Sequence, residues 1–175
     1  PAGFTPIAGT KSLWLGRPAC NSPTDCVLYT GAYGNDWDQF LVSREFTVSG
    51  NVTITFQLRY DSEASYDLLT LYYAKSDQVL HELKHWSGTG TEAVSQTVTA
   101  ANHDGKITFL LQFESDNGFS DEDGFVDSKG AATVDNIQIT DGAVTIDTQN
   151  FETSADGATN TPDFHWLCLG PPAAF

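Results

Sequence analysis

Apolar and polar residues alternate over long stretches of this chain, and this period of two constrains the fold more than any other feature. Between residues 52 and 60 the apolar positions are Val52, Ile54, Phe56, Leu58 and Tyr60, and the residues between them are polar or charged. Successive side chains of a β-strand point to opposite faces, so the pattern predicts a strand with one buried face. The same alternation predicts strands over residues 40–48, 67–74, 79–86, 93–99, 106–113, 132–139 and 144–147.

Turn signals separate most of these strands, and no segment has a convincing helical period. The signals are Ser49-Gly50-Asn51, Ser87-Gly88-Thr89-Gly90, Asp104-Gly105 and Asp141-Gly142. Their regular spacing is typical of a sandwich, and 175 residues fit one domain. We therefore predict an all-β fold, an antiparallel two-sheet jelly-roll sandwich formed by residues 1–147. Residues 148–175 are expected to form a C-terminal strand and tail that complete the sandwich, in the same chain or in a neighbouring subunit.

The net charge of the chain is strongly negative. Eight Lys and Arg stand against 23 Asp and Glu, which gives a formal net charge of -15 at pH 7. This field repels phosphate backbones and anionic lipid surfaces, so we expect no nucleic-acid partner. No stretch reaches the roughly 18 consecutive apolar residues that span a bilayer, so we expect no membrane insertion. Cations are the favoured ligands.

The cysteines suggest an oxidising compartment. Cys20 and Cys26 enclose a short Pro- and Asn-containing stretch that would form a small disulfide loop after secretion. The chain starts at Pro1 without an initiator Met, which we interpret as a processed or excised form. The cysteine loop favours secretion and hence an extracellular or cell-surface location. Cys168 is then an odd cysteine, either a buried free thiol or half of an intermolecular bridge.

Six carboxylates lie within the fourteen residues from Glu114 to Asp127. Like charges at this density raise one another's pKa, so a folded loop of this kind is costly unless a cation neutralises it. Calcium fits best, because it accepts six to eight oxygens from carboxylates, carbonyls and water. We name Asp116, Asp121 and Asp123 as ligands. A solvated acidic loop without an ion is the alternative, and sodium or magnesium also remain open.

Several motifs in this order resemble the MAM-like jelly-roll modules that accompany immune inhibitor A peptidases in secreted bacterial multidomain proteins. The motifs are Ser12-Leu13-Trp14-Leu15-Gly16, Tyr33-Gly34-Asn35-Asp36-Trp37-Asp38-Gln39, Ser65-Tyr66-Asp67-Leu68-Leu69, Ser120-Asp121-Glu122-Asp123-Gly124 and the segment 130–137. The resemblance implies a non-catalytic module in which Asp135 and the loop 120–124 bind calcium. Leu15 departs from the family, since many members have Cys there, so the cysteine pairing is not carried over.

The order of the family's elements looks permuted at the ends of this chain. Members usually open with a Phe-Glu strand, but here Phe151-Glu152 and a Trp-containing segment at 164–167 come last. We include Glu152 among the predicted calcium ligands. A sandwich that lacks its first strand leaves an open edge, which the tail fills in its own domain or in the next subunit. The second arrangement would build a head-to-tail fibre.

His81-Glu82-Leu83-Lys84-His85 matches the HExxH pattern of zinc peptidases. That pattern needs a helix, whereas this segment alternates like a strand. On a regular strand His81 and His85 share a face but lie roughly 13 Å apart, too far for one ion. We therefore expect no enzyme, and the peptidase is the least favoured function.

Two other sets of residues suggest weaker functions. Asp61, Glu63 and Asp67 would be paired acids in a glycosidase, but we expect solvated charges at strand ends. Seven aromatic residues have two interpretations: they form a sugar-stacking platform, or they pack in the core. They are Trp14, Trp37, Trp86, Trp166, Tyr66, Tyr72 and Tyr73. The first hypothesis is thus a calcium-stabilised structural or adhesive module that assembles with itself. The alternative is a carbohydrate-binding module whose partner is a glycan.

Overall fold

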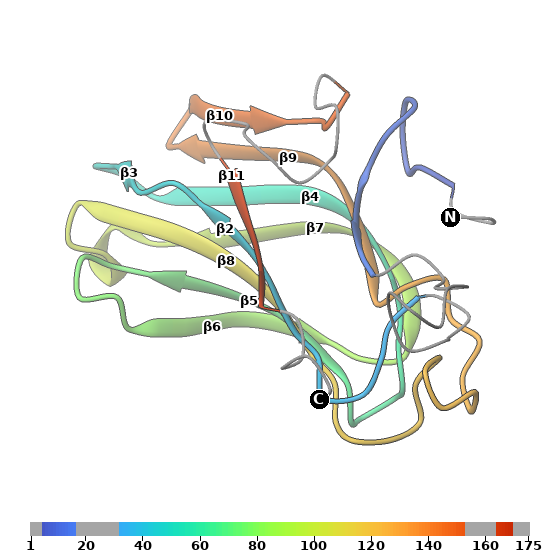
Figure 1. Cartoon of the computed structure of the whole chain (residues 1–175). Coiled ribbons are helices and arrows are strands. Elements are labelled where there is room, and N and C mark those ends of the chain that lie inside the picture. The colour runs from blue at the N-terminus through green and yellow to red at the C-terminus, as the bar shows by residue number, and fades with distance from the viewer. Residues whose placement is uncertain (1–4, 17–31, 153–163, 170–175) are drawn as a thin grey trace.

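The protein is a sandwich of two antiparallel β-sheets (Figure 1). Its structure is a computed structural model that describes residues 5–16, 32–152 and the backbone of residues 164–169. The five-stranded sheet contains β1 (Leu13–Leu15), β4 (Val52–Asp61), β7 (Thr89–Val98), β9 (Ala132–Asp141) and β10 (Val144–Gln149). The six-stranded sheet contains β2 (Asp38–Ser43), β3 (Phe46–Thr47), β5 (Leu68–Ala74), β6 (Leu80–Trp86), β8 (Lys106–Glu114) and β11 (Phe164–Leu169).

The chain crosses repeatedly between the sheets, which makes the sandwich jelly-roll-like. The strand order is β1-β9-β4-β7 in one sheet, where β10 also pairs with β9, and β11-β2-β8-β5-β6 in the other, where β3 also pairs with β8. Apart from the short 3-10 turn at Ala100–Asn102, the described residues contain no helix. The predicted all-β, two-sheet fold is confirmed. No helix long and apolar enough to cross a membrane was found within the described part of the chain.

The alternation of β4 explains how the core forms. Val52, Ile54, Phe56 and Leu58 are buried between the sheets, and the residues between them face outward. β4 pairs with β7 on one side and β9 on the other, so its apolar row lies at the centre of the five-stranded sheet. The inner face of the other sheet supplies Leu41, Leu69, Leu71, Phe109, Leu111 and Phe113.

The strands differ from the expectation in three main ways. The single strand expected over residues 40–48 is interrupted at Arg44 and Glu45, which separate β2 from β3. Thr89 and Gly90 were expected in a turn but begin β7. Gly90 pairs with Tyr60 of β4, and the position requires glycine because a Cβ there would lie 2.5 Å from the Tyr60 hydroxyl oxygen. The short strand β1 was not expected from its pattern.

The HExxH segment lies on β6, a strand, but the two histidines do not share a face. Leu71 pairs with Lys84 and Tyr72 with Glu82, so Leu83 is an extra residue and forms a bulge. His81 stacks on Tyr73 with ring centroids 4.9 Å apart. His85 Nδ1 is instead 2.6 Å from Glu82 Oε1. The expectation of a shared face was wrong, because one inserted residue reverses the alternation.

The C-terminal strand β11 pairs with β2 of the same chain, at the edge of the six-stranded sheet. The preceding strand β10 ends at Gln149 and runs across the expected boundary at residue 147. Cys168 lies opposite Gln39 in this pairing. Cys20 and Cys26, the expected disulfide, lie outside the described residues.

Candidate metal centre

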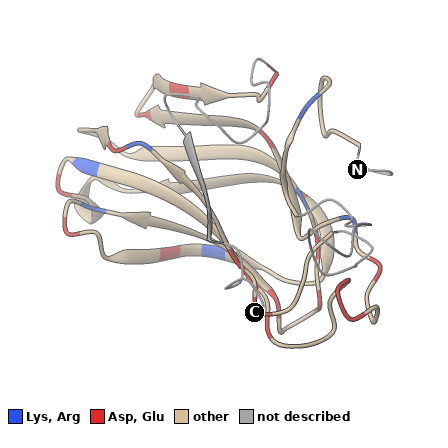
Figure 2. Cartoon of the chain, viewed as in Figure 1, with Lys and Arg blue, Asp and Glu red and all other residues tan. Residues whose placement is uncertain are grey.

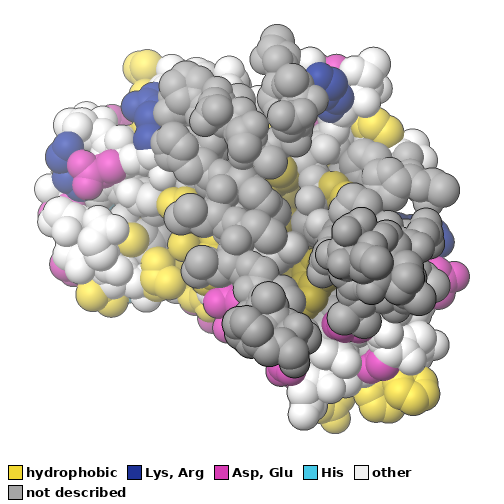
Figure 3. Space-filling model, in the orientation of Figure 1, with side chains coloured by type: hydrophobic (Ala, Val, Ile, Leu, Met, Phe, Trp, Pro, Cys, Tyr) yellow, Lys and Arg dark blue, Asp and Glu magenta, His cyan; other side chains and the backbone are white. Residues whose placement is uncertain are grey.

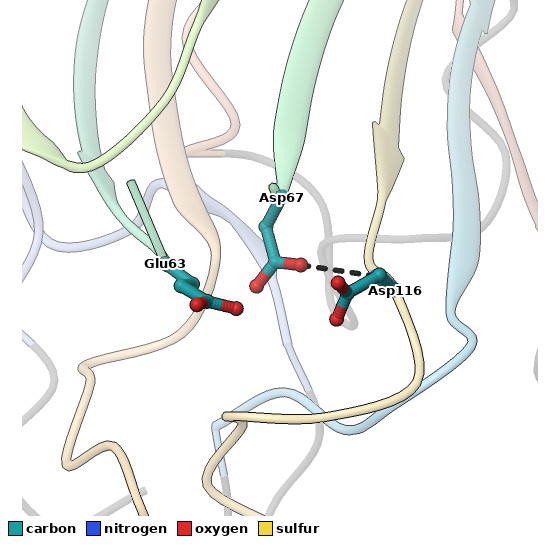
Figure 4. Close-up of side chains that lie close together, drawn as sticks. All are labelled: Glu63, Asp67 and Asp116. Atoms are coloured by element: carbon teal, nitrogen blue, oxygen red, sulfur yellow. Dashed lines mark hydrogen bonds between the residues drawn. The ribbon is translucent and has the colours of Figure 1, made fainter. Parts of the chain in front are cut away.

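Three carboxylates meet at one end of the sandwich (Figure 4). One oxygen from each of Glu63, Asp67 and Asp116 lies within 4.8 Å of the other two. Within the described part of the chain, this is the one group of three or more potential metal ligands. Acidic residues lie close together on the loops at this end (Figure 2). The close-up shows the Asp67 carboxylate between those of Glu63 and Asp116.

The strand pairing brings these three residues together. Glu63 follows β4, Asp67 directly precedes β5, and Asp116 lies just beyond β8. β5 and β8 are neighbours, so Asp67 and Asp116 leave the sheet side by side. Asp67 N donates to Glu63 O at 3.3 Å, and Asp116 N donates to Asp67 Oδ1 at 3.0 Å. The cluster therefore spans the β4–β5 and β8–β9 loops and joins the two sheets.

Asp67 has an incomplete set of hydrogen bonds despite its burial. Its exposed fraction is 0%, and Oδ2 is buried without a hydrogen-bond partner. The Tyr33 hydroxyl lies close enough to favour the ionised carboxylate but does not complete a hydrogen bond with Oδ2. Oε2 of Glu63 is likewise buried and unpaired. Native proteins rarely leave buried acceptors unsatisfied, and a bound cation is one group that would satisfy these two oxygens.

The electrostatics of the cluster oppose ionisation of its own acids. Burial raises the pKa of Asp67, and the nearby Tyr33 hydroxyl and the hydrogen bond from Asp116 N only partly offset this rise. Partial burial also raises the pKa of Glu63, and repulsion from Asp116 and Asp67 adds to the effect. Burial and the neighbouring Asp67 raise the pKa of Tyr33 as well. A cation among these oxygens would reverse the balance, because it stabilises the ionised carboxylates.

Of the five predicted ligands, Asp116 is the one that belongs to this cluster. Asp121 is buried, but its oxygens already accept hydrogen bonds from Ser128 N at 2.7 Å, Ser128 Oγ at 2.5 Å and Tyr33 N at 3.3 Å. Burial raises its pKa, although these bonds oppose the rise. Asp123 accepts from Phe125 N at 3.0 Å and from Asn35 Nδ2 at 3.2 Å. Hydrogen-bond donors of the protein thus satisfy the carboxylate oxygens of Asp121 and Asp123.

Asp135 and Glu152 hold the N-terminal segment instead of joining the cluster. Asp135 Oδ2 accepts from Ala8 N at 3.1 Å and Ser12 Oγ at 2.7 Å. Glu152 accepts from the hydroxyl of Thr10 at 2.6 Å and from its backbone N–H. These bonds lower the pKa of Glu152.

Glycine permits the close approach of Glu152. Gly9 has a φ of 56°, and a Cβ there would lie 2.2 Å from Glu152 Oε1. The N–H groups of Ala8, Thr10 and Lys11 thus point at the two carboxylates, Asp135 and Glu152, where a cation would need free lone pairs.

Glu63 and Asp67 were not predicted as metal ligands. The expectation that both are solvated charges was wrong for Asp67, which has no exposed surface. Asp67 stands in the motif Ser65-Tyr66-Asp67-Leu68-Leu69, but nothing in its neighbours separates a buried acid from an exposed one. Asp61 lies apart from the cluster and accepts hydrogen bonds from Thr89 Oγ1 at 2.9 Å and Lys129 N at 3.1 Å.

A second concave site lies where β4 and β7 meet the loop before β9. It is a pocket of about 200 Å³ lined by Arg59, Tyr60, Asp61, Thr89, Gly90, Thr91, Lys129, Gly130 and Thr133. Hydroxyl groups and both signs of charge line the pocket, so it suits a small polar ligand.

The aromatic side chains do not form an exposed row in the described residues. Trp37, Trp86 and Tyr73 are buried, whereas Trp14 and Tyr72 are partly buried. Tyr66 is exposed, but it lies on a loop. The side chain of Trp166 lies outside the described part. Core packing therefore accounts for Trp37, Trp86 and Tyr73. No protein-family model matches this sequence, and a search of curated proteins found no match.

Proposed function

We propose that the protein is an extracellular, calcium-stabilised β-sandwich module with a structural or adhesive role and no catalytic activity. The observation that carries this proposal is the fully buried carboxylate of Asp67, which lies between Glu63 and Asp116 and whose Oδ2 has no hydrogen-bond partner. The resemblance to MAM-like modules agrees with it. Calcium outside cells is plentiful enough for modules whose Kd lies at about 10⁻⁴–10⁻³ M.

The donor set suits a hard cation. All three side chains supply oxygen and none supplies nitrogen or sulfur, which disfavours zinc. Calcium tolerates irregular carboxylate arrangements, whereas magnesium demands near-octahedral geometry and keeps several waters. An ionised Asp67 without a partner would cost several kcal/mol, because burial removes its hydration. An ion that binds all three acids would remove most of that cost.

The position of the cluster supports a structural role over a catalytic one. Asp67 is fully buried, so its carboxylate has no surface to offer a substrate. The three residues come from loops that connect the two sheets. An ion here would fasten the β4–β5 loop to the β8–β9 loop and thereby close one end of the sandwich.

Thermal unfolding with calcium and then with a chelator tests this proposal. At a free calcium concentration of about 100 times the Kd, the native state gains about 2.7 kcal/mol. For a domain of this size, the gain raises Tm by about 5–11 °C. We expect Asp67→Asn to lose this rise and to lose calcium binding in isothermal titration calorimetry. Asp127→Asn, the same change at a side chain that is 96% exposed, is the matched control.

Two results would contradict the proposal. One is an equal Tm in calcium and chelator for the wild-type chain. The other is a calcium response that survives in Asp67→Asn or disappears in Asp127→Asn. Magnesium at the same concentrations provides the selectivity control.

Self-assembly through the C-terminal strand is the second part of the proposal. β11 pairs only with β2 among the described strands, at a sheet edge, so its place could be taken by the same strand of another copy. A head-to-tail exchange that does not close into a reciprocal pair builds a fibre. Electron microscopy of the full chain and of a chain ending at Gln149 would test it. Fibres that persist without β11 would rule out this strand as the donor.

Glycan binding is a second candidate function, and the polar pocket beside β4 and β7 favours it. Threonine hydroxyls, Arg59 and the Tyr60 ring are groups that hold sugars. A glycan array with the wild-type chain and with Thr91→Tyr, which narrows the pocket, would test this function. Signals that are the same for both proteins would exclude the pocket as a glycan site.

A further inference from the structure

Two phenylalanines project from the β8–β9 loop into solvent. The exposed fraction is 56% for Phe119 and 71% for Phe125, and their ring centroids are 5.2 Å apart. In Figure 3, hydrophobic atoms reach the surface beside acidic ones at the lower right, where this loop lies. Exposed apolar groups that lie together within a polar rim are typical of interaction sites.

The loop holds this pair outward through its own hydrogen bonds. Asp121 lies between the two phenylalanines in the sequence, and its side chain is buried. It accepts hydrogen bonds from Ser128 N and Ser128 Oγ, which hold the loop in place. Asp123 Oδ1 accepts from Phe125 N at 3.0 Å and so shapes the turn before Phe125. Phe119 has a φ of 57°, a conformation that is uncommon for a residue with a Cβ. An ordered and partly strained loop therefore presents both rings.

The rim of the pair is acidic. Glu122 and Asp123 are exposed, and Asp127 is 96% exposed. Lys129 is a cation in the same loop, but it forms an ion pair with Asp127: its Nζ lies 3.8 Å from Asp127 Oδ1. A partner that approaches the rings therefore meets negative charge, and a second copy of this chain would carry a net charge of -15 toward it. Anionic membranes are disfavoured for the same reason.

We propose that Phe119 and Phe125 form the docking site for a basic segment of a partner protein. An Arg side chain of that segment stacks on the rings while the rim carboxylates attract its charge. Arg on an aromatic face combines cation–π attraction with apolar contact, and Arg is enriched among interface hot spots. This site uses none of the three carboxylates of the metal centre, so the two proposals stand or fall separately.

A labelled peptide of alternating Gly, Arg and Leu is the probe, measured by fluorescence anisotropy with the full chain in calcium. The matched peptide contains citrulline, which has the shape of Arg without its charge. We expect the Arg peptide to bind about tenfold more tightly than the citrulline peptide, a difference of about 1.4 kcal/mol. The double variant Phe119→Ser/Phe125→Ser should lose a similar factor. Val144→Ser, at an exposed apolar side chain outside this loop, should bind like the wild type.

The charge of the rim has its own variant. Glu122→Gln/Asp123→Asn removes two charges but keeps an acceptor oxygen for the backbone N–H of Asn35 and one for that of Phe125; the Asp123 oxygen that accepts from Asn35 Nδ2 is replaced by an amide nitrogen. It should weaken binding of the Arg peptide and flatten the salt dependence. Circular dichroism and Tm confirm that each variant is folded, as expected for changes at exposed side chains.

Several outcomes would overturn the proposal. Undetectable binding of the Arg peptide, equal binding of the citrulline peptide, or equal binding by the double Phe variant would each do so. A dimer of the wild-type chain that the Phe variant loses would make a second copy the partner instead. Binding to phosphatidylserine vesicles that the Phe variant loses would make a membrane the partner instead.

Discussion

Asp67 and Asp135 are both buried carboxylates, but their surroundings differ. Asp135 is 1% exposed, and donors from Ala8, Ser12 and Asn136 satisfy both of its oxygens. Asp67 is 0% exposed, faces two other acids and has one unpaired oxygen. The comparison teaches that the donors around an acid, and not the number of acids in the sequence, decide whether a cation is needed.

The largest effect expected from this comparison is the loss of stability caused by a substitution at Asp135. Asp135→Ala leaves the N–H groups of Ala8 and Asn136 without their acceptor, so we expect a loss of about 3 kcal/mol in the free energy of unfolding. Calcium should not change this loss. Urea unfolding with calcium and with chelator measures both quantities. A loss that calcium restores would mean that Asp135 is a metal ligand after all.

Asp67→Asn should have the opposite sign in chelator. Without an ion, the substitution removes a buried charge and repulsion from Glu63 and Asp116, so we expect a gain of about 1 kcal/mol. The amide oxygen can still accept from Asp116 N. Urea unfolding in chelator measures the gain. A clear destabilisation in chelator would show that the ionised Asp67 is satisfied without a cation.

The pH dependence of the ion-free protein is a smaller effect and sharpens the same contrast. The pKa values of Asp67 and Glu63 are raised above their ordinary 3.8 and 4.5, so above these values the folded state binds more protons than the unfolded state. Stability should therefore fall as pH rises through this window, and saturating calcium should abolish the fall.

Other carboxyls affect the pH profile in separable ways. The pKa of Asp121 is also raised, mainly by burial, and its contribution should not respond to calcium. Hydrogen bonds lower the pKa values of Asp141 and Glu152, so their stabilisation is lost only below the ordinary values, as pH falls. Measuring Tm against pH in chelator, for the wild type and for Asp67→Asn, separates the contribution of Asp67 from those of the other carboxyls. An equal fall in both proteins would contradict the role of Asp67.

The smallest effect concerns Glu152, whose carboxylate is at the surface. Glu152→Gln keeps an acceptor oxygen for Thr10 and Lys11 but removes the charge that strengthens their hydrogen bonds. We expect faster amide hydrogen exchange at these two residues, with a smaller change than Asp135→Ala causes there. Unchanged exchange would show that Glu152 does not hold the segment.

Much of the fold follows from local pattern, and the candidate site only in part. The alternation over residues 52–60 correctly located β4, because the two faces of a strand differ in burial along its whole length. The alternation over residues 79–86 did not reveal the bulge at Leu83, because the sequence does not show which residue lacks a partner on the neighbouring strand. The dense acidic loop contained Asp116 but also acids that solvent and N–H donors already satisfy.

The sequence by itself determined that this chain forms a two-sheet β-sandwich and that cations suit its charge, because side-chain alternation and net charge are properties of the chain alone. Only the tertiary structure decided which acids meet. Glu63 and Asp67 are four residues apart, but Asp116 reaches them because β8 pairs with β5 in the six-stranded sheet. The burial of Asp67 and the lack of a donor to its Oδ2 likewise arise from that packing, and the order of residues shows neither.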